Sequence, residues 1–169
     1  TAGLHFTPAV FRELEANGVA VEDVTLHVGA GTFRPVSEER VEDHPMHEEW
    51  YEIAPGTADR LNAARKDGRR IVAAGTTSLR ALESAAAGGG GGGAGAAWTR
   101  LFLYPPAQFH AVGALLTNFH LPKSTLLMLV AAFLAPGSES GGRRAIELYG
   151  EAIRRGYRFY SYGDCMFVE

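Results

Sequence analysis

The segment from Leu115 to Ala135 reads LLTNFHLPKSTLLMLVAAFLA. It begins as a short apolar run, is interrupted by Asn118 and His120, and resumes as a dense apolar stretch after Pro122. Because proline has no amide hydrogen to donate to a sheet, we expect a strand to end before it. Asn118 and His120 are costly to bury without partners, so we expect both to meet polar groups.

A helix is expected directly after the turn, with the body Leu126–Leu134 and with Ser124 or Thr125 as its cap. The result is a strand–turn–helix corner, whose free amide groups at the helix start suit a small anionic group. Simple helix capping would account for the same residues. The sequence leaves both interpretations of Ser124 and Thr125 open.

Helical and strand patterns alternate along the rest of the chain. Helices are expected from Pro8 to Gly18, at 58–66 with Thr57 as cap, at 79–86 and at 143–155, the last with Ile146, Tyr149 and Ile153 facing inward. Strands are expected at 21–28, 50–53, 71–74, 101–104, 115–116 and 157–162. This alternation predicts an α/β fold with a mostly parallel or barrel-like sheet.

Composition predicts one domain over residues 1–169, since 46% hydrophobic and 21% charged residues are ordinary for a globular protein. The net charge of −3 supplies no global attraction to nucleic acid or membranes. The longest apolar run, Leu126–Ala135, is too short to span a bilayer, and the single Cys165 fits a reducing compartment. We therefore expect a cytoplasmic protein without membrane contact, and a monomer. The chain starts at Thr1 without Met, so we expect a fragment or a processed piece.

A glycine run with one alanine occupies residues 88–95. It has almost no side chains to bury and maximal backbone entropy. We expect a flexible surface loop there.

Two predicted strands are followed by turns that contain glycine and hydroxyl-bearing residues. Gly29-Ala30-Gly31 resembles the start of a dinucleotide fingerprint, but Arg34 stands where the third glycine is required. What remains is either a turn that lets backbone approach a ligand, with Thr32 beside it, or a plain bulge. Pro122–Thr125 likewise lacks the upstream glycine of a phosphate loop.

The second turn is Gly75-Thr76-Thr77-Ser78, which leads from a buried strand into a helix. Its three hydroxyls and free amides suit a small anion or a polar ligand. Ordinary capping explains the same pattern.

Histidines stand beside turns or polar interruptions at several positions, namely His5, His27, His44, His47 and His120. His44 and His47 lack the spacing of a helical zinc pair, so general acid–base work or ligand binding fits better than a metal site. Arginines near the C-terminus alternate with aromatic residues over 143–162, which allows either a phosphate-and-stacking surface or a solvated helix face beside a core strand. Cys165 is interpreted as a small buried residue.

Several of these blocks resemble the QueA family, the S-adenosylmethionine:tRNA ribosyltransferase-isomerases of queuosine biosynthesis. The matching strings are TAGLHFT at 1–7, TLHVGAGTFRPV at 25–36, MHEEWYEI at 46–53, GTTS at 75–78, LTNFHLPKSTLLMLV at 116–130 and YRFYSYGD at 157–164. The resemblance covers about the C-terminal half of the family's chain. It implies the family's larger α/β domain without the inserted β-barrel domain. The amino-acid sequence departs from the family's pattern at 104–109, at 164–166 and in the glycine run.

The resemblance implies that the ribosyl group of S-adenosylmethionine is transferred to a 7-aminomethyl-7-deazaguanine at the wobble position of tRNA. The product would be epoxyqueuosine, with adenine and methionine released, and neither metal nor cofactor would be needed. We expect the base and the acid among His27, His47 and His120. Asn118 and Arg34 would orient the substrate.

We expect Gly29, Gly31, Thr32, Thr76, Thr77, Ser78, Ser124 and Thr125 to contribute to substrate binding. Three alternatives remain open at this stage: a part that binds ligand or tRNA without activity, a metal-dependent hydrolase built on the histidines, and a family member with a changed substrate.

Overall fold

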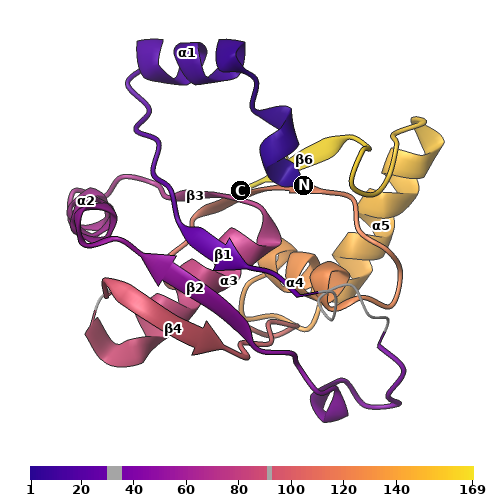
Figure 1. Ribbon diagram of the computed structural model, residues 1–169. Coiled ribbons are helices and arrows are strands. Elements are labelled where there is room, and N and C mark those ends of the chain that lie inside the picture. Colours follow the sequence, from indigo (N-terminus) through magenta and orange to yellow (C-terminus); the bar gives the residue numbers. More distant parts are fainter. Residues whose placement is uncertain (30–35, 91–92) are drawn as a thin grey trace.

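The strands of the computed structural model, which describes residues 1–29, 36–90 and 93–169, form two three-stranded sheets (Figure 1). The first sheet is antiparallel and has the order β1 (Thr25–His27), β2 (Glu49–Ile53), β4 (Gly95–Thr99). The second has the order β3 (Val72–Ala74), β5 (Ala114–Asn118), β6 (Cys165–Val168). Only its β3–β5 pair is parallel, since β6 is antiparallel to β5. The α/β class is therefore confirmed, but with one antiparallel and one mixed sheet in place of the mostly parallel or barrel-like sheet expected.

The α-helices are α1 (Pro8–Ala16), α2 (Pro55–Lys66), α3 (Thr76–Ala85), α4 (Thr125–Leu134) and α5 (Gly141–Arg154). Short 3-10 turns form η1 (Ala2–His5) and η3 (Val41–Asp43), and a π-helix forms η4 (Ala86–Gly90). Within the described part of the chain, no helix combines the length and the apolar character needed to cross a membrane.

The opening segment forms the strand and the helix that its sequence predicts. In β5, four of five residues are buried, as in a strand covered on both faces. The helix α4 is apolar on nearly all sides and supplies seven buried residues. Ser124 caps it, because the Ser124 hydroxyl accepts a hydrogen bond from the Leu127 amide at 3.2 Å. Capping and hydrophobic pattern therefore act together at this corner.

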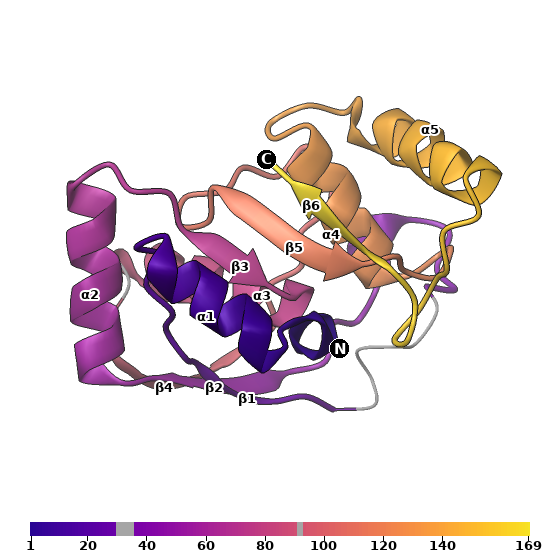
Figure 2. The ribbon, with the colours of Figure 1, turned by 90° about the horizontal axis from the view of Figure 1, so that it is seen from above.

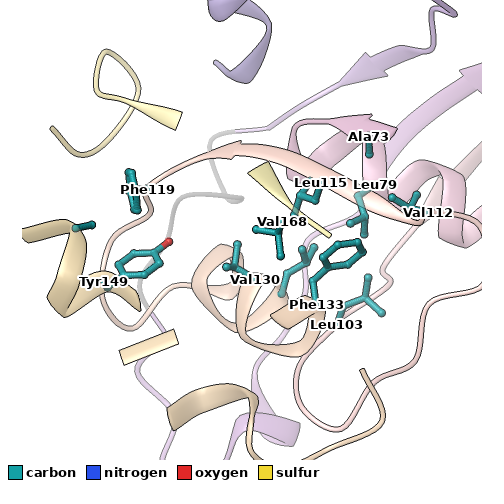
Figure 3. Packing of buried hydrophobic residues seen from close by; sticks show 12 residues of the cluster. Ala73, Leu79, Leu103, Val112, Leu115, Phe119, Val130, Phe133, Tyr149 and Val168 are labelled. Carbon is teal, nitrogen blue, oxygen red and sulfur yellow. The ribbon is translucent and has the colours of Figure 1, made fainter. Parts of the chain in front are cut away.

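The helix α3 lies between the two sheets (Figure 2). Leu79 joins the larger hydrophobic cluster, which holds Leu115 of β5 and Val130 of α4 (Figure 3). Ala81 and Ala85 belong to a second cluster with Tyr51 and Ile53 of β2. Leu82 packs against both clusters, so α3 is shared by both halves of the core.

The helix α1 stands apart from both sheets in Figure 1. Its start is as predicted, because the Thr7 hydroxyl accepts a hydrogen bond from the Val10 amide at 3.3 Å and Pro8 follows. No residue of α1 is buried, and Phe11 is 45% exposed. The predicted helix is therefore confirmed, while its apolar face contributes nothing to the core.

Two predicted strands are wrong. The apolar run 101–104 lies beyond the end of β4 and forms a loop, in which Leu103 is buried in the larger cluster. Strand pairing with β2 is instead made by Gly95–Thr99. The run 157–162 is a turn, because Tyr160 adopts a positive φ of 70°, and the last strand starts only at Cys165.

Two helix details also differ from expectation. On α5, Tyr149 is buried as predicted, but Ile146 is 77% and Ile153 is 66% exposed, since Ala145 and Ala152 make the inward contacts. The cap of α2 is Ala54, with Pro55 in the first turn, so Thr57 is a buried residue inside the helix.

The loop within the glycine run 88–95 is shorter than predicted. The π-helix η4 continues through Gly90 and β4 begins at Gly95, so both elements take part of the run. Residues 91–92 lie outside the described residues.

Candidate active site at the carboxyl ends of β3 and β5

Two parallel strands end side by side and both lead into helices. Ala74 of β3 pairs with Leu116 of β5, and the Gly75 amide continues the ladder by donating to the Leu116 carbonyl at 2.8 Å. Gly75 has a φ of 98° and turns the chain at once into α3. The chain after β5 reaches α4 through Ser124. Ligands of open α/β sheets bind at this edge, beyond the carboxyl ends of the strands.

Asn118, the last residue of β5, connects three segments at this edge. It is 2% exposed, and its Nδ2 donates to the Tyr160 carbonyl at 3.2 Å. The same Nδ2 lies 3.1 Å from His5 Nε2, and the Thr1 hydroxyl donates to Asn118 Oδ1 at 3.4 Å. Because a carbonyl only accepts, the amide nitrogen must face Tyr160, and His5 Nε2 is then an acceptor. Asn118 thus holds η1, β5 and the C-terminal turn together.

His120 lies next to this hub in a largely buried position. Its Nε2 is 2.9 Å from the Thr117 hydroxyl, and its backbone amide donates to the Tyr149 hydroxyl at 3.1 Å. Burial lowers the pKa of His120 from its ordinary value of 6.5 to about 4. Burial also raises the pKa of Tyr149 to about 12. Near neutral pH this pair is therefore an uncharged imidazole and an uncharged phenol.

The helix starts at this edge are closely packed. Ser124 Oγ donates to the Leu121 carbonyl at 2.7 Å in addition to its cap bond, so capping accounts for its hydroxyl. Thr125 and Thr76 are 7% and 6% exposed. Thr77 and Ser78 are half-buried at the start of α3. Substrate binding by these hydroxyls stays a prediction.

A surface hollow of about 500 Å³ opens beside the hub. It is lined by Leu4, His5, Tyr157, Arg158, Ser161, Tyr162, Gly163, Asp164 and Cys165. Cys165 is the strand partner of Asn118, and burial raises the pKa of its thiol. His5 therefore contacts both the buried hub and the open hollow.

The other predicted histidines belong to the first sheet. His27 on β1 is exposed, and its ring packs edge-on against Trp50 of β2 with 4.6 Å between centroids. His47 is exposed just before β2. Gly29 is exposed after β1, whereas Gly31, Thr32 and Arg34 lie outside the described residues. The structure thus places His120 and Asn118 at one edge, whereas His27 lies on the other sheet and His47 in the segment just before it.

Three groups at the hub were missing from the predicted site: His5, Tyr149 and the Tyr160 carbonyl. His5 carried a usable signal, since it is a histidine in one of the blocks that resemble the family. The sequence pattern of α5 predicts Tyr149 to be a core residue. The position of a backbone carbonyl, such as that of Tyr160, cannot be predicted from residue types.

A second hollow of about 670 Å³ includes His44, Arg100, Phe102 and Tyr104 in its lining. His44 Nδ1 is 2.8 Å from Glu38 Oε2, and this contact holds the pKa of Glu38 at about 2. Among residues 1–29, 36–90 and 93–169, no cluster of three or more His, Cys, Asp or Glu side chains is placed to hold a metal ion.

Comparison with known proteins identifies the family. A model of the queuosine biosynthesis protein family matches residues 1–168. Proteins named S-adenosylmethionine:tRNA ribosyltransferase-isomerase are 58% identical in Methylocella silvestris, over 97% of this chain and 44% of the relative, and 49% identical in Moorella thermoacetica, over 99% and 47%. This chain therefore spans about half the length of these relatives.

A crystal structure of S-adenosylmethionine tRNA ribosyltransferase from Thermotoga maritima is similar over the whole of this chain and 52% of its own, with a TM-score of 0.79 and 43% identity. This similarity matches the family's larger domain without its inserted barrel, as the sequence led us to expect. On the evidence of the family model, the relatives and the shared fold, the chain belongs to the queuosine biosynthesis protein family.

Proposed function

We propose that the protein transfers and isomerises the ribosyl group of S-adenosylmethionine onto 7-aminomethyl-7-deazaguanine at the wobble position of tRNA. Epoxyqueuosine-tRNA forms, and adenine and methionine are released. The observation that carries the proposal is the Asn118 hub, which joins His5 and the C-terminal turn next to His120, at the carboxyl ends of β3 and β5 in a chain from this family. S-adenosylmethionine acts as a substrate, and no cofactor enters the reaction.

The chemistry requires an uncharged base and a proton donor, and of the proposed groups this edge offers His120 and Asn118. The sulfonium acidifies the neighbouring C5′ hydrogens, so an uncharged base can remove one of them, and a donor must then serve adenine as it leaves. His120 is uncharged near neutral pH because burial lowers its pKa to about 4, which keeps it available as an acceptor. His27, His47 and His120 are the proposed base and acid. Asn118 and Arg34 are the proposed orienting groups.

Alanine variants of the three histidines test this assignment. Adenine release from S-adenosylmethionine is measured with precursor-bearing tRNA, using full-length protein. Loss of the base or the acid should lower kcat by about 10²- to 10⁴-fold. His110→Ala is the matched control, because His110 is exposed and carries no proposed role. Near-wild-type rates in His27→Ala, His47→Ala and His120→Ala together would exclude the assignment.

A second candidate is a ligand- or tRNA-binding unit without activity. It is favoured by the observation that the chain covers only 44–48% of its relatives' length, which leaves room for groups outside residues 1–169. Residues 1–169 and full-length protein should be compared for S-adenosylmethionine binding and adenine release. Binding without release by residues 1–169 alone would favour this candidate.

A further inference from the structure

The loop Tyr157–Gly163, between α5 and β6, exposes three tyrosine rings. Tyr157 is 46%, Tyr160 is 53% and Tyr162 is 88% exposed. Exposed aromatic rings that cluster on one short loop are a feature of binding surfaces rather than of the average surface. We refer to residues 157–163 as the tyrosine loop.

The tyrosine loop is held in a defined shape. Tyr160 has a φ of 70°, a left-handed conformation that a bulky residue adopts only when its surroundings impose it. Those surroundings are the Tyr160 amide, which donates to the Phe119 carbonyl at 3.0 Å, and Asn118 Nδ2, which donates to the Tyr160 carbonyl at 3.2 Å. The Asp164 amide closes the loop by donating to the Arg158 carbonyl at 2.8 Å. The rings are therefore presented to solvent from a fixed backbone.

The position of the loop links it to the candidate active site. Tyr157 and Tyr162 line the 500 Å³ hollow together with His5. The Tyr160 backbone is bonded directly to Asn118. A nucleotide that reaches the hub carries its neighbours along the same strand, and these must lie over the surface around the hollow.

Cationic groups accompany the rings. Arg158 pairs with Asp164 at 2.9 Å, and Arg154 and Arg155 both pair with Glu151, all with exposed side chains on the arginine side. Exposed ion pairs of this kind contribute little to stability, so an arginine can exchange its carboxylate for a phosphate at small cost.

We propose that the tyrosine loop binds unpaired nucleotides of the RNA substrate beside the base that is modified, with Tyr162 and Tyr160 stacking on bases and Arg158 contacting a phosphate. Single-stranded RNA is recognised in this way, by aromatic stacking combined with arginine contacts. The proposal rests on the proposed function, because it takes tRNA as the substrate.

Tyr162 gives the sharpest test, because its ring is almost fully exposed and its removal leaves the fold intact. The dissociation constant of full-length protein for an anticodon stem–loop RNA is measured by fluorescence anisotropy. Tyr162→Ala should weaken binding about tenfold, since loss of one stacked base is worth roughly this factor or more. Tyr162→Phe keeps the ring and should bind as the wild type does. Trp98→Ala removes another exposed ring (64%), from β4 on the other sheet, and should leave the dissociation constant unchanged.

A salt titration tests the arginine contact. Arg158→Gln should reduce the slope of log K against log salt by about 0.7, the value for one phosphate contact on a single strand. Arg143→Gln, at the start of α5, should leave the slope unchanged.

The outcomes separate this proposal from the proposed function. If wild-type protein releases adenine and binds the RNA while Tyr162→Ala binds equally well, only the tyrosine loop proposal is overturned. It is also overturned if Tyr162→Phe is as damaging as Tyr162→Ala, or if Tyr162→Ala alters only the oligomeric state. If wild-type protein neither binds the RNA nor releases adenine, the proposed function fails as well.

Discussion

Asn118 and His120 show what a polar residue in an apolar segment requires. Both interrupt the run that starts at Leu115, and burial without partners would be costly. The structure supplies partners to both: Asn118 meets His5 and the Tyr160 carbonyl, and His120 meets Thr117. The need for partners was predictable. Their identity was not, because His5 and Tyr160 are 113 and 42 residues away along the chain.

His120 makes stability depend on pH. Its folded-state pKa of about 4 lies below the ordinary value of 6.5, so the unfolded chain binds a proton that the folded chain does not. The contribution of His120 to the free energy of unfolding is fully present above about pH 6.5 and is lost as the pH falls toward 4. Between pH 7 and pH 4.5 this one group should remove roughly 2–3 kcal/mol from the free energy of unfolding.

Urea unfolding of the wild type and of His120→Gln at both pH values measures this contribution. The variant cannot take up the proton, so its loss of stability should be smaller by that amount. His27→Gln removes an exposed imidazole and should follow the wild type. Equal losses in the wild type and His120→Gln would show that His120 titrates alike in both states.

At the scale of helices and strands, Ser124 stabilises the junction between β5 and α4. Its hydroxyl accepts from the Leu127 amide and donates to the Leu121 carbonyl, and the residue is 5% exposed. Ser124→Ala removes both bonds in a buried place, so we expect a loss of about 2 kcal/mol, at the upper end for a cap. The measurement is urea unfolding at pH 7.

The matched control for this cap is Thr7→Ala on α1. Its hydroxyl makes the same kind of bond to Val10, but in an exposed helix that buries no residue. We expect less than about 1 kcal/mol there. A Ser124→Ala loss no larger than that of Thr7→Ala would mean that burial adds nothing to the cap.

Elements with local signals were predictable, and elements set by distant pairing were not. The helix α4 has a cap, a proline before it and an apolar body, all within one segment. By contrast, 101–104 has the composition of a strand, yet the hydrogen bonds of β2 are taken by Gly95–Thr99. The choice between two neighbouring runs is made by register against a partner about 45 residues away, which composition does not encode.

The candidate site follows the same division. Asn118, His120 and the two helix starts lie in contiguous segments and could be found by reading the sequence. The arginines and aromatic residues over 143–162 suggested a phosphate-and-stacking surface as one possibility, but the conformation of the tyrosine loop could not be predicted, because its aromatic alternation resembles a strand. Its shape depends on the bonds from Asn118 and Phe119 to Tyr160, which only the folded chain forms.

At the scale of the whole molecule, the two sheets are joined through α3. Arg80 of α3 is 3% exposed, and its Nη1 donates to Glu49 of β2 at 2.6 Å. Its Nε donates to the Leu101 carbonyl, just beyond β4, at 3.0 Å. Burial lowers the pKa of Arg80, and Glu49 acts against that shift. One side chain thus ties the helix that follows β3 to β2 of the other sheet and to the loop that follows β4.

Removing one partner of this pair should therefore destabilise the molecule as a unit. Arg80→Met keeps the bulk of the side chain but removes the cation that pairs with buried Glu49, for which we expect a loss of about 3–5 kcal/mol in urea unfolding. The double variant Arg80→Met/Glu49→Leu removes both charges and should recover part of that loss, because well-packed apolar residues can replace a buried pair. Arg143→Met breaks the exposed pair with Glu147 and should cost less than about 1 kcal/mol. A double variant less stable than Arg80→Met would show that the junction between the two sheets requires the charged pair itself.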